Sequence, residues 1–303
     1  MTKKLFSYGL WFDHQAEQAA QFYTSVFPNS KMGDIVLYGN EGHEIHGGKE
    51  GTVMATEFDL CGEKFVAING GPLFKLNPSI SFFVVFETVQ EADRIWSTLL
   101  EGGKILMPYQ KYDWSEKYGW LEDRYGLSWQ VSFGKISDVR QQLTASLLFV
   151  GEKAGKAEAA ISYYTSIFKD SKVDGVMKYP AGGPEPEGNV AHAQFGLSGQ
   201  KFMIMESTNA GHNFTFNEAV SIIINCDTQE EIDFYWNRLV AEGEESNCGW
   251  LKDKFGVSWQ VDYTGLTKML KDPDEKKTQR VTKAFLKMKK YDVEKLTAAF
   301  EGR

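Results

Sequence analysis

Two segments of the chain carry the same polar groups at the same spacing: YGWLEDRYGLSWQV at 118–131 and CGWLKDKFGVSWQV at 248–261. Nine of the fourteen positions are identical. Alternate side chains of a strand share a face, so the serine and the glutamine of each segment point to one side. An amide beside a hydroxyl both donates and accepts hydrogen bonds, which suits a ligand with a carbonyl or hydroxyl group. The first candidate ligand contacts are therefore Ser128, Gln130, Ser258 and Gln260.

A third polar group lies on the strand-like segment AHAQFGL, where His192 and Gln194 share a face. The matching positions in the first half of the chain are Ala55 and Glu57. A histidine beside a glutamine can bind a ligand or act as a general base. The alternative is a partly buried histidine whose hydrogen bonds are satisfied by its neighbours.

Aromatic side chains precede both closing strands, with Trp120 in the first and Trp250 in the second. Such rings can hold a planar or apolar ligand, and they can equally belong to the core. Between Trp120 and the strand, Asp123 and Gly126 predict a tight turn. Glycine permits the positive φ there, and an aspartate can accept bonds from the backbone ahead of it.

The elements that position these residues are duplicated as a whole. FYTSVFPNSKMGDIVLY (22–38) returns as YYTSIFKDSKVDGVMKY (163–179), and VMATEFDLCGEKF (53–65) returns as VAHAQFGLSGQKF (190–202). The repeating unit of about 130 residues is domain-sized. We predict domains at 1–134 and 143–264, followed by a helical extension at 265–303. Residues 105–118 have almost no counterpart in the second copy.

Within each copy the hydrophobic pattern alternates between the periods of strands and helices. Residues 5–12 alternate as a strand does, and apolar residues from Ala16 to Val26 follow helical spacing. Three short strands separated by glycine turns come next. The same order then begins again at SISFFVVF. Each copy is therefore expected to contain two βαβββ modules in an α+β fold.

Three motifs carry a resemblance to a known family: the FYTSVFP-type helix, the segment GEKFVAINGG and the closing G-W-L-x-D-x-x-G-x-S-W-Q-V. They resemble the PhnB-like branch of the vicinal oxygen chelate (glyoxalase/bleomycin-resistance) superfamily, and the resemblance covers almost all of 1–264. It implies that two modules curl an antiparallel or mixed sheet into a cup lined by the Ser/Gln face. It also implies that the two copies pair within the chain, as a monomer or homodimer.

Metal-dependent enzymes of that superfamily place a glutamate where Gln130 and Gln260 stand, and a histidine or glutamate on the strands that open the modules. The corresponding positions here are Phe6 or Ser7, Ser79 or Ser81, Ser146 or Leu147, and Ala219 or Ser221. Divalent metals prefer anionic or imidazole ligands, and these positions supply none. We predict no cofactor, and a divalent metal is the alternative.

The function predicted is the binding of an unidentified small molecule in a metal-free aromatic and polar cup. His192 and Gln194 are expected to make the second copy the more polar site, and residues 105–118 to enclose the first. The alternative is a metal-dependent enzyme of glyoxalase, lyase or dioxygenase type. The methyltransferase label attached to many such domains finds no support, because no G-x-G-x-G turn follows a strand.

Charge and composition exclude other classes of protein. A net charge of −8 argues against nucleic-acid binding, which needs a basic surface. No apolar run reaches the roughly 18 residues of a membrane span. The three cysteines are far apart, as reduced thiols of a cytoplasmic protein would be, and the N-terminus does not have the pattern of a signal peptide.

Overall fold

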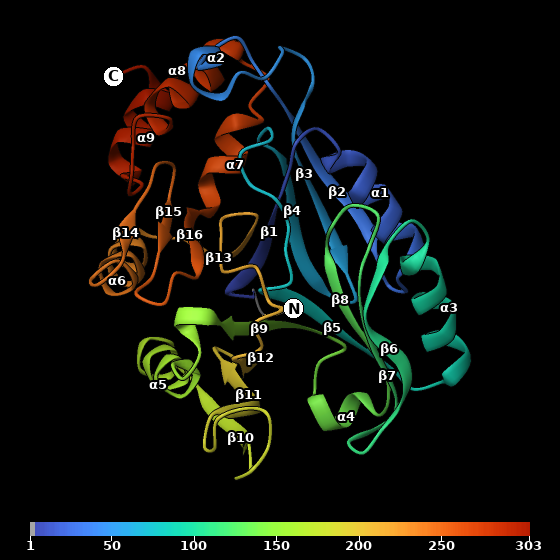
Figure 1. Ribbon diagram of the computed structural model, residues 1–303. Helices are drawn as coiled ribbons and strands as arrows, with labels where there is room; N and C mark the ends of the chain where they lie inside the picture. Colours follow the sequence, from blue (N-terminus) through green and yellow to red (C-terminus); the bar gives the residue numbers. More distant parts are fainter. Residues whose placement is uncertain (1–3) are drawn as a thin grey trace.

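The computed structural model describes residues 4–303, except for the side chains of residues 45 and 46. The first copy supplies two βαβββ modules (Figure 1). The first module consists of β1 (Phe6–Phe12), α1 (Ala16–Val26), β2 (Lys31–Leu37), the short α2 (His43–His46), β3 (Val53–Leu60) and β4 (Glu63–Asn69). The second consists of β5 (Ile80–Phe86), α3 (Val89–Leu100), β6 (Lys104–Tyr112), β7 (Ser115–Glu122) and β8 (Ser128–Phe133).

A short helix, α4 (Ile136–Val139), links the copies. The third module consists of β9 (Leu143–Val150), the 3-10 turn η1 (Gly151–Lys153), α5 (Ala157–Ile167), β10 (Lys172–Lys178), β11 (Val190–Leu197) and β12 (Gln200–Ser207). The fourth consists of β13 (Val220–Cys226), α6 (Gln229–Leu239), β14 (Glu244–Glu245), β15 (Trp250–Lys252) and β16 (Ser258–Tyr263). The C-terminal extension forms α7 (Thr264–Leu270), α8 (Glu275–Phe285) and α9 (Val293–Glu301).

Local sequence signals explain the helices that cover the sheets. The side chains of Thr88 and Thr228 cap α3 and α6 by accepting hydrogen bonds from the backbone three residues ahead. Each helix then buries one apolar stripe, which in α3 contains Ala92, Ile95, Trp96 and Leu99. The unmatched segment 105–118 becomes the long hairpin of β6 and β7, which the second copy replaces with the short β14 and β15.

The strands form two mixed sheets of eight strands each. Sheet A has the order β14-β15-β16-β13-β1-β4-β3-β2, and sheet B has the order β10-β11-β12-β9-β5-β8-β7-β6. The expected α+β architecture and βαβββ modules are confirmed. The expectation that the two modules of one copy share a cup is wrong, because each sheet joins one module of the first copy to one module of the second.

The central strand pairs show why the modules combine in this way. β1 lies antiparallel to β13, with Tyr8 opposite Ile222, and β5 lies antiparallel to β9, with Phe82 opposite Ala145. The short link through α4 delivers β9 directly beside β5. Residues 70–79 instead carry the chain from β4 in sheet A to β5 in sheet B, so each copy contributes to both sheets.

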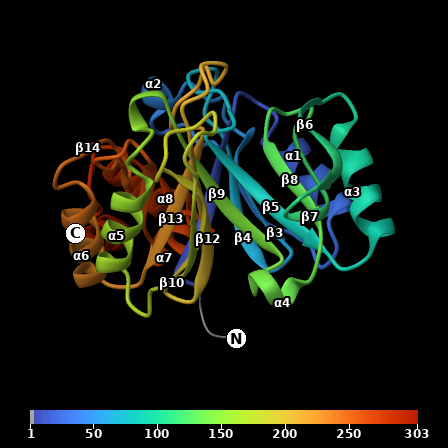
Figure 2. The ribbon, with the colours of Figure 1, turned by 60° about the horizontal axis from the view of Figure 1, so that its bottom comes forward.

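One continuous core lies between the apolar faces of the two sheets. The rings of Tyr8 in sheet A and Phe82 in sheet B are 5.1 Å apart, and those of Phe6 and Phe202 are 5.3 Å apart. Helices α1 and α3 flank this core on one side and α5 and α6 on the other (Figure 2). The opposite, outward face of each sheet therefore carries the predicted Ser/Gln face. We call the outward face of sheet A cup A and that of sheet B cup B.

Contacts across cup A show that sheet A is strongly curled. β1 and β15 are three strand positions apart, about 14 Å in a flat sheet. The rings of Trp11 and Trp250, one from each strand, nevertheless lie only 6.1 Å apart. Helix α7 starts directly after β16 and rises by about 10 Å. Lys271 at its end forms an ion pair with Asp34 of β2, the far edge of the sheet, so α7 crosses one end of cup A (Figure 1).

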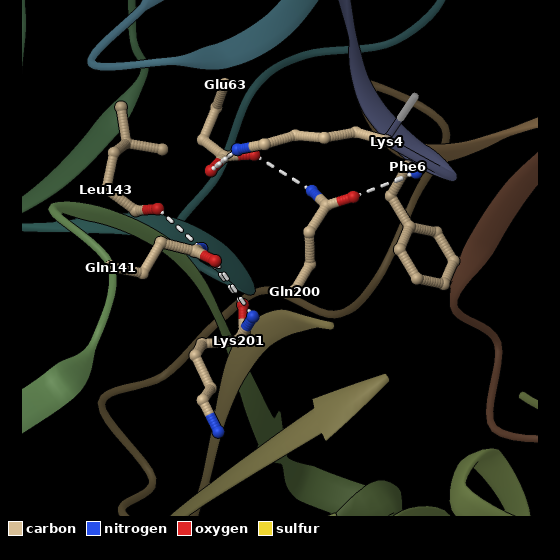
Figure 3. A network of polar contacts seen from close by, with 7 residues as sticks. All are labelled: Lys4, Phe6, Glu63, Gln141, Leu143, Gln200 and Lys201. Atoms are coloured by element: carbon tan, nitrogen blue, oxygen red, sulfur yellow. Dashed lines mark hydrogen bonds and ion pairs between the residues drawn. The ribbon is translucent and has the colours of Figure 1, made fainter. Parts of the chain in front are cut away.

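A buried polar network joins the two copies between the sheets (Figure 3). Gln200 of the second copy donates to Glu63 at 2.8 Å and accepts from the Phe6 backbone N–H at 3.0 Å. Lys4 forms an ion pair with the same Glu63 carboxylate. The interface between the two copies, which were predicted to pair within one chain, thus contains buried polar contacts. No helix in residues 4–303 is long and apolar enough to span a bilayer.

Candidate functional site

The predicted site residues separate into two groups that mix the copies. Cup A contains Gln260, Ser258 and Trp250 from the second copy together with Glu57 from the first. Cup B contains the remainder: Gln130, Ser128, Trp120, His192 and Gln194. His192 therefore does not accompany Gln260, and the expectation that the second copy would form the more polar site by itself is wrong. The cause is the pairing of modules between copies, which local sequence does not reveal.

Each closing strand is anchored by the aspartate of the predicted turn. Asp123 Oδ1 accepts from the backbone N–H groups of Tyr125 and Leu127 at 2.8 and 3.1 Å, and Oδ2 accepts from Trp129 Nε1 and Tyr23 Oη at 2.8 Å each. Gly126 has a φ of 88°, so the turn prediction is confirmed. Asp253 repeats these bonds in the second copy. The tryptophan of each Trp-Gln-Val run thus holds the turn, and the glutamine faces the cup.

The two glutamine amides have different partners. Gln130 Nε2 donates to Ser81 Oγ at 2.7 Å, and its Oε1 accepts from Tyr118 Oη at 2.8 Å. Gln260 Nε2 likewise donates to Ser221 Oγ at 2.8 Å. No donor among the described groups binds Gln260 Oε1, and 9% of this residue stays exposed. The amide of cup B is satisfied at both ends, whereas that of cup A retains a free acceptor.

Cup B is filled largely by apolar side chains. Trp120 is 8% exposed and donates from Nε1 to Ser128 Oγ at 2.6 Å. It packs in one cluster with Leu148, Met205 and Phe214, which come from β9, β12 and the loop before β13. Side chains of the β6–β7 hairpin, including Met107, join the same cluster, as expected for an insertion that encloses this cup. The two polar groups most relevant to ligand binding here, Gln130 and Ser128, are thus already engaged.

His192 and Gln194 lie at the side of cup B. Burial lowers the pKa of the His192 imidazole below its usual value, so the ring is neutral at pH 7. The His192 imidazole forms no hydrogen bond with the described residues. Gln194 Nε2 donates to the carbonyl of Val139 and to Asp174, at 3.3 and 3.2 Å. Gln194 therefore serves to hold the link between the copies in place.

Cup A combines an aromatic end with a polar floor. Trp11 and Trp250 meet edge to face, Phe74 lies 5.1 Å from Trp11, and Trp11 Nε1 donates to the Gly71 carbonyl at 2.8 Å. Ser258 is fully buried on the floor, and its Oγ has no hydrogen-bond partner among the described residues. Cup A is thus incompletely satisfied in two places, at Ser258 and at Gln260.

The sequence interpretation missed Asp262, which lies two residues beyond Gln260 and therefore on the same face of β16. Burial raises the pKa of its carboxyl to about 7, and the negative charge of Glu57 contributes to this rise. The two carboxylates come from β16 and β3, so they sense each other only because the sheet is curled. Glu57 has Lys64 at 3.7 Å, whereas Asp262 forms no ion pair in the described structure. The period-two pattern alone was sufficient to find Asp262.

The donor set at the superfamily's metal positions does not fit a transition metal. In cup A these positions hold Ser7, Ser221 and Gln260, whose two hydroxyl groups and amide Nε2 bond to protein neighbours, so that only the neutral Gln260 Oε1 is left. In cup B the Gln130 amide is occupied at both ends. Hydroxyl and amide oxygens without an anionic or imidazole ligand bind such metals poorly. No group of three or more His, Cys, Asp or Glu side chains in the described residues is arranged to hold a metal ion. The prediction that no metal cofactor is used stays a prediction.

Two surface depressions lie outside both cups. One, of about 860 Å³, lies between α6 and the segment joining α8 to α9, and is lined by Asp233, Lys290 and Tyr291 among others. The other, of about 510 Å³, lies where the loops before β5 and β13 meet, near Asn77 and Asn217. Asn77 donates to the Thr215 carbonyl and Asn217 to the Lys75 carbonyl, so this second depression belongs to the contact between copies.

Comparison with solved structures shows that this fold is glyoxalase-like. Glyoxalase I from Zea mays is 13% identical, with a TM-score of 0.54 over 89% of this chain and 98% of its own. This likeness shows that the two chains share a fold. The chain belongs to the family described as 3-demethylubiquinone-9 3-methyltransferase, whose pattern matches residues 4–132 and 141–262.

Shorter relatives match less than half of this chain over nearly their whole length, as a protein with one copy of the repeat would. The PhnB protein from Bacillus cereus is 38% identical over 42% of this chain and 98% of its own, with a TM-score of 0.39. A Staphylococcus aureus protein is 29% identical over 45% of this chain and all of its own, with a TM-score of 0.19. No curated protein matches the chain. The family match to both 4–132 and 141–262 confirms the resemblance to PhnB-like proteins in two tandem copies.

Proposed function

We propose that the protein binds a small molecule in cup A without a transition metal. The observation that carries this proposal is the Gln260 amide, which is fixed through Nε2 to Ser221 while its Oε1 has no donor among the described residues. Gln260 Oε1 is not among the fully buried atoms that lack a partner, so it can be reached from the cup, and a ligand that donates to it completes the hydrogen bonding of a fixed amide. The nearby rings of Trp11 and Trp250 provide apolar surface for the rest of the ligand.

Two reaction types find less support. A glyoxalase, lyase or dioxygenase reaction on a metal would need ligands that Ser7, Ser221 and Gln260 do not supply. The family description names a methyltransferase. The parallel strand pairs within residues 4–303 are isolated among antiparallel neighbours, unlike the parallel sheet to which most S-adenosylmethionine enzymes bind their cofactor. The three cysteines are far apart in the sequence and are not arranged as a disulfide framework, which favours a cytoplasmic location for the binding protein.

A thermal-shift screen of small molecules tests the proposal, with Gln260→Ala compared against the matched variant Gln130→Ala. Each ligand's shift is measured relative to that variant's own melting temperature. Stabilisation by a hit should be lost in Gln260→Ala and retained in Gln130→Ala, because the Gln130 amide is already satisfied. A hit that stabilises both variants as it does the wild type contradicts binding in cup A. Tightly held metal found by elemental analysis of the purified protein would contradict the metal-free part of the proposal.

A further inference from the structure

The duplicated cups differ in charge at equivalent positions. Gln260 faces Ile223 and Trp250 across its neighbouring strands, as Gln130 faces Phe83 and Trp120. Two residues beyond these glutamines, cup A has Asp262 where cup B has Ser132.

The strands on the other side of each cup, β3 in cup A and β11 in cup B, also differ in charge, and cup A is again the more acidic. Glu57 is paired with Val66 in sheet A, and Gln194 is paired with Met203 in sheet B. Val66 and Met203 each follow a phenylalanine, Phe65 or Phe202, that occupies the same place in its copy, so Glu57 and Gln194 are equivalent positions. Cup A therefore carries two carboxylates where cup B carries a hydroxyl and an amide.

The lysines around cup A do not neutralise both carboxylates. Lys64 lies 3.7 Å from Glu57, Lys271 pairs with Asp34, and Lys252 pairs with Glu218 at 2.9 Å. Asp262 is densely surrounded, yet it keeps a partly exposed surface and has no cation among the described side chains. Among the described residues, the hydrogen bond to its carboxyl comes from the backbone N–H of Tyr263. An ionised carboxylate in such surroundings is strongly stabilised by an approaching cation.

Two further polar groups on the same face of β16 also have atoms without a partner among the described residues. The Ser258 hydroxyl is fully buried on the same face of β16 and has no partner in the described structure. The free Oε1 of Gln260 lies between Ser258 and Asp262 along that strand. Together they form a row of polar groups along β16, with Trp250 paired to Gln260 from β15 and the Trp11 ring 6.1 Å from that of Trp250. Aromatic faces attract cations as well as apolar groups.

We propose that cup A selects a ligand with a protonated amine or comparable cationic nitrogen joined to an apolar or aromatic body. This inference rests on the proposed function and specifies its ligand class. The cation lies between Asp262 and Glu57, N–H groups donate to Gln260 Oε1, and the apolar body contacts Trp11 and Trp250. Cup B, which lacks both carboxylates, does not make this selection.

Matched probes test the selection. Tryptamine, tryptophol and indole-3-acetate share one ring system and differ in charge, and phenethylamine, 2-phenylethanol and phenylacetate form a second set. Binding is measured at pH 8 by calorimetry and thermal shift. Asp262→Ser and Glu57→Gln each install the residue that cup B carries at the equivalent position. Asp93→Asn is the control, since it removes a carboxylate that pairs with Lys117 outside both cups.

The amine of at least one set should bind more tightly than its alcohol and its carboxylate. Asp262→Ser and Glu57→Gln should each weaken amine binding on the order of tenfold, because a charge-assisted contact is lost. Asp93→Asn should leave it unchanged. Equal binding of the alcohol, a preference for the carboxylate, or no amine binding in either set overturns the charge class. A neutral hit from the wider screen that is lost in Gln260→Ala would leave the proposed function intact while refuting this inference.

Discussion

The side-chain amide of Gln260 lies directly against the backbone of Gly9. A methyl group on the Gly9 Cα would come 2.6 Å from Gln260 Nε2 and 2.4 Å from Ser221 Oγ. The equivalent position in cup B is Ser146, which lies opposite Ser81 as Gly9 lies opposite Ser221. Because Gly9 has no side chain, it leaves the space that the Gln260 amide occupies on the face of sheet A.

Gly9→Ala should therefore displace the amide and its bond to Ser221. We expect a loss of about 1 to 3 kcal/mol in unfolding free energy from overpacking, together with the loss of any ligand that depends on Gln260. Gly175→Ala is the matched control, because a methyl group at that strand glycine meets no atom within 4 Å. Chemical denaturation and ligand thermal shifts measure both effects. Wild-type stability and binding in Gly9→Ala would show that the amide can move without cost.

Asp123→Ala should be severely destabilising, because it removes the acceptor of four hydrogen bonds in a buried turn. We expect a cost of about 3 kcal/mol or more in unfolding free energy. Asp253→Ala should cost a similar amount, since it breaks the same set of bonds in the second copy. The exposed Asp113→Ala serves as the control. The unfolding free energies are measured by urea denaturation. Surface changes usually stay within about 0.5 kcal/mol, so values for all three variants within about 0.5 kcal/mol of one another would contradict this role.

The two-residue alternation of strands and the residue types of tight turns made several local features predictable. Strand alternation placed Gln130 and Gln260 on the outward faces, and the Asp-x-x-Gly spacing gave the turn at Gly126. Both depend on neighbours within a few residues. The βαβββ order was visible for the same reason.

The pairing of modules was not predictable from local pattern. β5 and β13 have nearly the same alternation, so nothing in either strand specifies whether β1 joins one or the other. The choice depends on contacts such as that of Tyr8 with Phe82, which form only once both sheets pack around the shared core. The electrostatic interaction of Glu57 with Asp262 follows from this choice, and could not be predicted for the same reason.

Gln200→Leu should destabilise the contact between the copies. The substitution removes the acceptor of the Phe6 backbone N–H and the donor to Glu63, and both partners are buried (Figure 3). Leaving these groups unsatisfied should cost about 2 to 4 kcal/mol in unfolding free energy. Gln21→Leu, which loses only an exposed bond to Glu17, is the control and should change stability little. Equal denaturation midpoints for the two variants would show that the network contributes nothing to the pairing of the copies.

Asp262 should make the stability of the protein depend on pH between about 4 and 7. Its folded pKa of about 7 lies well above the ordinary value of about 3.9, so the folded state binds the proton more tightly than the unfolded state. The stability gained from this proton is fully present below the ordinary pKa and is lost as the pH rises through the folded pKa. The titratable groups facing Asp262 are Glu57 and the Tyr291 phenol, and neither offers a compensating positive charge.

Asp262→Asn removes this titration and should match the wild type near pH 4. At pH 8 it should be the more stable protein by up to about 4 kcal/mol, since three pKa units correspond to roughly that free energy. Melting temperatures measured from pH 4 to pH 8 check the prediction, with Glu57→Gln as a comparison. That variant should shift the wild-type transition to lower pH, because the nearby negative charge is gone. Parallel profiles for the wild type and Asp262→Asn would show that the carboxyl does not titrate in this range. If they diverge as expected, wild-type affinity for an amine should also rise from pH 6 to pH 8, because only the ionised carboxylate attracts the cation.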